Sequence, residues 1–144
     1  MEKELKESKE LKEMLVKHGV VLAYLFDSHL ENGHLRATPM GEMNIYKLGM
    51  LFEKDMRRFQ RELHINALRN EINHLFQNDF EVIDLKDAAP ILMYQIANKY
   101  GQLLFEDSLT HPQVEFKAYT ASRCADWNAF LEAHKEISGA RPTQ

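Results

Sequence analysis

The chain has 144 residues and a formal net charge of −4, from 18 Lys and Arg side chains against 22 Asp and Glu. Its length and its hydrophobic content of 44% predict a single globular domain over 1–144 and argue against a disordered or fibrous protein. The mild acidity argues against direct nucleic-acid binding, because proteins that bind nucleic acids are normally basic. No apolar run approaches the roughly 20 residues of a membrane-spanning helix, so no membrane association is expected.

Two features predict a cytoplasmic location. The first residues are charged and lack the apolar stretch of a signal peptide. The single Cys124 excludes an internal disulfide and a cysteine-rich zinc site. Both features fit a reducing environment.

The first third of the chain predicts one helix and two buried strands. Residues 2–18 alternate Lys and Glu around an apolar stripe and predict an amphipathic helix, which Gly19 ends. Residues 20–26 are apolar on both faces, as in a buried strand. A polar stretch over 27–44 predicts a long loop. Residues 45–52 predict a second buried strand.

The rest of the chain alternates helices and strands. The expected elements are a long helix over 53–77, a strand over 80–85, a short helix over 90–99, a fourth strand over 101–106 and a last helix over 111–137. The tail over 138–144 contains Gly139 and Pro142 and is expected to be disordered. This order predicts an α/β fold (α+β by stricter labels), a small mixed sheet of about four strands packed with helices.

Four of these segments carry a resemblance to a known family. Residues 20–28 match an apolar strand that ends in Phe-Gly-Ser, and 47–52 match Asp-Leu-Ala/Gly-Val-Leu-Phe. Residues 80–85 match Val-Asp-Val-Val-Asp-Leu, and 101–106 match Gly-x-Leu-Leu-Tyr-Glu. In this order and spacing the chain resembles the minimal nucleotidyltransferase (MNT) family of MntA-like antitoxins, found beside HEPN-type partners in bacteria and archaea. The resemblance covers roughly residues 15–137 and implies a nucleotidyltransferase-like fold.

The resemblance also implies a chemistry. Active members transfer a nucleotidyl group from a nucleoside triphosphate and are thought to silence a HEPN-type ribonuclease by adenylylating it. Their Gly-Ser turn lets the backbone approach the phosphates. An Asp-x-Asp pair on the second strand and a third carboxylate on the next strand hold the divalent metal ions, which neutralise the charge of the transferring group.

This chain departs from the pattern at most of those positions. Asp27 replaces the glycine, and Ser28 alone remains of the signature. Ile45 and Lys47 occupy the two carboxylate positions, and Glu81 matches the third. An ammonium and a dication about 4 Å apart repel by roughly 8 kcal/mol at an effective dielectric of 20. The degenerate site therefore predicts a pseudoenzyme that uses no cofactor.

Two questions stay open from the residues alone. Lys47 either pairs with Glu81 across adjacent strands or extends its ammonium to solvent. An alternative register places Glu42 and Asn44 with Glu81 as an oxygen-rich site. In that register the chain would be a divergent enzyme that uses magnesium and ATP for adenylyl transfer.

The leading functional hypothesis is a partner-binding module. The resemblance implies an antitoxin-like role toward a HEPN-type ribonuclease, exerted by occlusion within a homo- or hetero-oligomer such as a dimer. A small homodimeric scaffold is a further possibility. Trp127, Phe130 and Leu131 are expected in the core, with a partner contact as the alternative. Arg57, Arg58 and Arg61 are expected on a solvated face.

Overall fold

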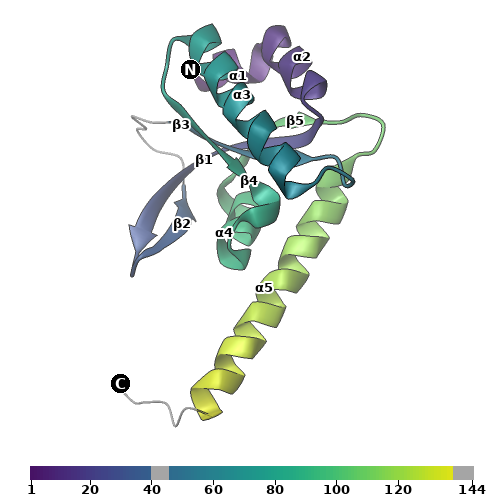
Figure 1. Cartoon of the computed structure of the whole chain (residues 1–144). Coiled ribbons are helices and arrows are strands. Elements are labelled where there is room, and N and C mark those ends of the chain that lie inside the picture. Colours follow the sequence, from purple (N-terminus) through teal and green to yellow (C-terminus); the bar gives the residue numbers. More distant parts are fainter. Residues whose placement is uncertain (40–45, 138–144) are drawn as a thin grey trace.

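The computed structural model describes residues 1–39 and 46–137. It confirms the α/β class, with a mixed β-sheet and helices on both of its faces (Figure 1). The sheet has five strands rather than about four. The predicted disordered tail lies outside the described residues.

The elements follow the expected order with one added strand. They are α1 (Glu2–Glu7), α2 (Lys9–Lys17), β1 (Val20–Glu31), β2 (His34–Thr38), β3 (Tyr46–Phe52), α3 (Arg58–Phe76), β4 (Phe80–Asp84), the 3-10 turn η1 (Leu85–Asp87), α4 (Pro90–Gln95), the π-helical turn η2 (Ile96–Tyr100), β5 (Gln102–Glu106) and α5 (Pro112–Ile137).

Strand β1 is the centre of the sheet. It pairs antiparallel with β2, β3 and β5. Strand β3 pairs parallel with β4, and α3 connects these two strands. The parallel strand–helix–strand unit places the starts of β3 and β4 beside each other. They lie at the end of the sheet where the pairing of β1 with β3 stops, at Phe26.

The expected loop over 27–44 is wrong for residues 27–38, which form a β-hairpin. Strand β1 continues to Glu31, and β2 returns beside it. The connection is Asn32–Gly33, whose φ angles are 53° and 79°. An Asn-Gly pair is the preferred two-residue hairpin turn because both positions need a positive φ. This turn signal was present in the sequence, but the polarity of the stretch concealed it.

The predicted helix over 2–18 is two helices. Ser8 has an extended backbone and separates α1 from α2. Its hydroxyl accepts a hydrogen bond from the Leu11 amide at 3.1 Å and so caps α2. The apolar stripe still faces inward, because Leu5, Leu11 and Leu15 are all buried.

Two hydrophobic clusters hold the helices against the sheet. On one face, α1, α2 and α3 pack through side chains such as Leu11 and Leu68. On the other face, α4, η2 and α5 pack through Leu92, Ile96 and Phe116. Because both faces of the sheet are covered here, residues 20–26 of β1 are apolar without interruption.

Helix α5 packs on the sheet only through its first turns. Phe116 and Thr120 are buried, whereas residues 121–133 are exposed except for the half-buried Cys124. The helix therefore projects from the body of the protein (Figure 1). The expectation that Trp127, Phe130 and Leu131 lie in the core is wrong, because these side chains are 39–48% exposed.

Candidate functional site

The structure brings three of the predicted site positions to one end of the sheet. Lys47 on β3 lies opposite Phe26 on β1 and opposite Glu81 on β4. Asp27 follows Phe26 directly along β1. Neighbouring strands are about 4.8 Å apart, so the three side chains share a small region, as the resemblance implied.

Lys47 forms an ion pair with Asp27. Its Nζ lies 4.0 Å from Asp27 Oδ1, and the two side chains are 20% and 22% exposed. This partner differs from both alternatives considered for Lys47, a pair with Glu81 or an extension into solvent. Glu81 is exposed. The ammonium that stands at a metal-ligand position is thus neutralised by the residue that stands at the glycine position.

Asp27 and Ser28 lie inside a continuous strand rather than in a turn. They pair with Thr38 and Ala37 of β2. The Ser28 amide donates to Asp27 Oδ1 at 2.8 Å. The Ser28 hydroxyl is buried and has no hydrogen-bond partner among the described residues. An extended backbone therefore stands at the two positions where the family has its phosphate-approaching turn.

The described residues at this site do not fit a magnesium nucleotide. Magnesium needs several hard oxygen ligands in octahedral geometry. Here Lys47 lies between two carboxylates and already engages Asp27. Among the side chains described, in residues 1–39 and 46–133, no group of three His, Cys, Asp or Glu is placed to hold a metal ion. Ile45 and the alternative ligands Glu42 and Asn44 lie outside the described residues.

A buried arginine network stands near the end of β4, and sequence reasoning did not predict it. Arg61 Nε donates to Asp84 Oδ2 at 2.6 Å, and its other nitrogens donate to Asp87 Oδ1 and the Met56 carbonyl. The Arg61 and Asp84 side chains are only 7% and 8% exposed. Burial lowers the pKa of Arg61, but the hydrogen bond and charge of Asp84, with Asp87, raise it overall. The predicted solvated face is therefore wrong for Arg61, although Arg57 and Arg58 are exposed.

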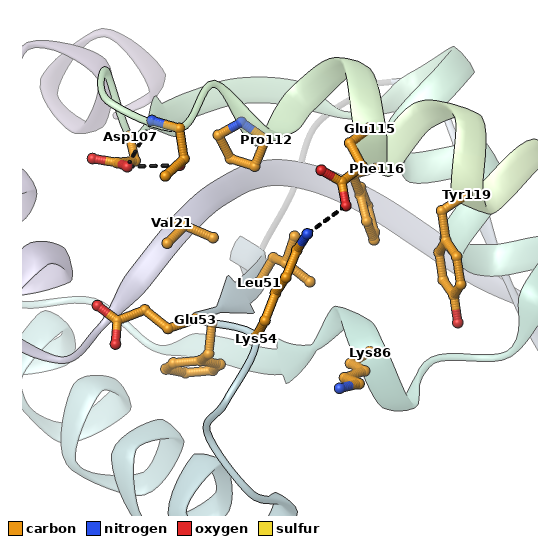
Figure 2. Close-up of a pocket in the computed structure, with 12 residues that line it drawn as sticks. Val21, Leu51, Glu53, Lys54, Lys86, Asp107, Pro112, Glu115, Phe116 and Tyr119 are labelled. Carbon is orange, nitrogen blue, oxygen red and sulfur yellow. Dashed lines mark hydrogen bonds and ion pairs between the residues drawn. The ribbon is translucent and has the colours of Figure 1, made fainter.

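The described residues also form a pocket of about 660 Å³ at the opposite end of the sheet. Val21, at the start of β1, and Leu51, near the end of β3, form part of its wall (Figure 2). Helix α5 contributes Phe116 and Tyr119. The sequence pattern gave no sign of this pocket, because its walls come from segments far apart in the chain.

Comparison with solved structures places the fold. A tri-AMPylated HEPN toxin of Shewanella oneidensis in complex with MNT antitoxin matches with a TM-score of 0.60 at 16% identity, over 95% of this chain and 94% of that chain. A toxin–antitoxin complex with AMP-PNP matches with a TM-score of 0.57 at 17% identity, over 90% and 94% of the two chains. The MntA–HepT toxin–antitoxin complex matches with a TM-score of 0.54 at 15% identity, over 90% and 94%.

The chain has the nucleotidyltransferase-like fold of these complexes. The resemblance inferred from four sequence segments is thus confirmed at the level of the fold, over nine-tenths of the chain. No family model and no curated protein matches the sequence. None of the helices described is both long and apolar enough to span a membrane.

Proposed function

We propose that the chain is a catalytically inactive, nucleotidyltransferase-like antitoxin that binds a HEPN-type ribonuclease and blocks it by occlusion. The observation that carries this proposal is the Lys47–Asp27 ion pair. It joins the position of a metal-binding carboxylate to the position of the phosphate-approaching glycine. The likeness in fold to toxin–antitoxin complexes supports the class of partner.

The electrostatics of the pair support inactivity. A magnesium nucleotide that entered this site would meet the Lys47 ammonium where the family presents a carboxylate. Asp27, which could attract the metal, is engaged by Lys47 at 4.0 Å. The extended backbone at Asp27 and Ser28 removes the turn that lets phosphates approach. These features act together against nucleotide binding and leave protein contact as the function.

The test is co-expression with the product of the neighbouring gene, which we expect to be a HEPN-type ribonuclease. We expect the wild-type chain to relieve the growth arrest caused by that toxin and to co-purify with it. Mass spectrometry of the co-purified toxin should show no added AMP. Titration of the purified chain with ATP should give no heat of binding with or without magnesium. Failure of the wild-type chain to bind or protect would contradict the antitoxin role.

The alternative is a divergent adenylyltransferase that uses Glu42, Asn44 and Glu81. It predicts AMP on the toxin, magnesium-dependent ATP binding, and loss of protection in Glu81→Gln. Glu10→Gln, at an exposed position on α2, is the matched control. Under the occlusion mechanism, Glu81→Gln and Glu10→Gln should protect equally well, whereas AMP on the toxin would overturn inactivity.

A further inference from the structure

The pocket at the far end of the sheet from Lys47 has the size of a binding site. Its volume of about 660 Å³ lies in the range of ligand and side-chain pockets, roughly 300–1,000 Å³. Val21, Leu51 and Phe116 give it an apolar floor (Figure 2). Neither the degenerate site nor the proposed inactivity accounts for this pocket.

The charges around the pocket are arranged asymmetrically. Glu53 and Asp107 lie at one end, and Lys86 lies at the other end below Tyr119 (Figure 2). Between them, Lys54 donates to Glu115 at 2.6 Å. Hydrogen bonds from Thr110 lower the pKa of Asp107, which stays ionised at neutral pH. The pocket thus presents an acidic end, an apolar floor and a basic end.

The face of α5 that lines the pocket continues along the projecting part of the helix. Its exposed members, which we call the α5 stripe, recur at spacings of three and four residues and are Tyr119, Arg123, Trp127, Phe130 and Leu131. The four apolar side chains are 39–48% exposed. The Trp127 and Phe130 rings stack with centroids 5.5 Å apart. At 1.5 Å per residue, this face extends the pocket wall by roughly 18 Å.

The arrangement fits a helix of a partner protein. Contiguous apolar surface on a projecting helix marks an interaction site, and side chains at three- and four-residue spacing form ridges that pack against another helix. Large aromatic side chains beside a pocket are typical of the centre of such interfaces. The charges also predict the orientation of the partner helix. It would place a basic side chain near Glu53 and Asp107 and an acidic side chain near Arg123.

We propose that the pocket and the α5 stripe together dock one helix of the partner, with an apolar side chain of that helix seated in the pocket. The inference rests on the proposed function for the identity of the partner, a HEPN-type ribonuclease. It adds where that protein binds, at the end of the sheet away from the degenerate site. We expect the charges of Glu53 and Asp107 at one end of this surface and of Arg123 along the stripe to set the orientation of the partner helix.

The experiment measures the affinity of that purified HEPN-type protein for variants of the full chain. Tyr119→Glu alters the pocket, and Leu131→Glu alters the distal stripe. The matched control is Val114→Glu, which is 78% exposed on the same helix. At 100° per residue, Val114 lies about 160° around the helix from Phe116, whereas the members of the α5 stripe lie within about 60° of it. We expect at least a tenfold weaker affinity for the first two variants, about the loss of one interface hot spot, and less than a twofold change for the control.

Charge is tested separately. Arg123→Glu should weaken binding about fivefold, which is less than the loss at an apolar hot spot because rim charges contribute less. Its control is Arg69→Glu at an exposed position of α3. Circular dichroism melts of every variant separate loss of binding from loss of folding.

The outcomes distinguish the two proposals. Wild-type binding that survives Tyr119→Glu and Leu131→Glu overturns this surface and leaves the antitoxin role intact. Absence of wild-type binding overturns the antitoxin role itself and with it the partner named here. Light scattering on the isolated chain tests whether a second copy of the chain binds this surface instead. A dimer that Leu131→Glu converts to a monomer would assign the surface to a second copy and overturn the proposal.

Discussion

The Lys47 ammonium on β3 and the Asp27 carboxylate on β1 lie 4.0 Å apart, although the residues are 20 positions apart in the sequence. Each residue alone would place an uncompensated charge in a region that is about four-fifths buried. Together they neutralise each other. The two departures from the family pattern therefore compensate electrostatically, which is the physical reason to treat them as one change.

A double-mutant cycle measures this compensation. Lys47→Met leaves the Asp27 carboxylate without its cation, and Asp27→Asn leaves the Lys47 ammonium without its anion. We expect each variant to lower the free energy of unfolding by about 1 kcal/mol, and the double variant to lose less than the sum by about 0.5–1 kcal/mol. Urea unfolding measures all four proteins. Strictly additive losses would show that the pair does not interact.

The Arg61 network predicts a much larger effect. Arg61→Met removes the cation from two carboxylates, and it leaves Asp84, whose side chain is 8% exposed, with the Lys86 amide as its one hydrogen-bond partner among the described residues. We expect a loss of about 3–5 kcal/mol in the free energy of unfolding. Arg58→Met is the control, because Arg58 also pairs with Asp87 but is 73% exposed, and its loss should stay below about 1 kcal/mol. If the two variants lost similar amounts of unfolding free energy, burial of Arg61 would not explain its contribution to stability.

Tyr24 predicts a stability change at alkaline pH. Burial raises the pKa of its phenol; the Gln113 side chain lowers it and the charge of Glu106 raises it, so the pKa is raised overall. The unfolded chain ionises near pH 10, while the folded protein keeps the proton, so the unfolded state binds fewer protons above that pH. The free energy of unfolding should therefore fall as pH rises above about 10 in the wild type.

Tyr24→Phe isolates that contribution. The Tyr24 hydroxyl meets no strict hydrogen-bond geometry among the described residues, although the Gln113 side chain is its polar neighbour, so we expect the stability of the variant at pH 7 to stay close to that of the wild type. Above pH 10 the variant should lose less stability than the wild type. Guanidinium unfolding at several pH values gives both profiles. Parallel profiles would rule out Tyr24 as a source of the alkaline loss.

Local pattern predicted most of the fold. The apolar run at 20–26 and the period-two pattern at 45–52 predicted β1 and β3, because a buried strand must be apolar. The hairpin over Asp27–Thr38 was missed although Asn32–Gly33 signals it. The break at Ser8 was also missed. The Lys and Glu pattern continues across Ser8, but the Ser8 hydroxyl caps a new helix there.

For the candidate site too, some features could be predicted from the sequence and others could not. The sequence by itself determined which residues stand at the family's functional positions, and it predicted that Lys47 disfavours a metal ion there. Tertiary structure alone decided that Lys47 pairs with Asp27 and that Arg61 is buried against Asp84. It alone decided that a pocket forms at the other end of the sheet and that α5 leaves the body of the protein. Periodicity and composition report which face of an element is apolar, whereas ion pairs, pockets and exposed stripes depend on how separate elements pack together.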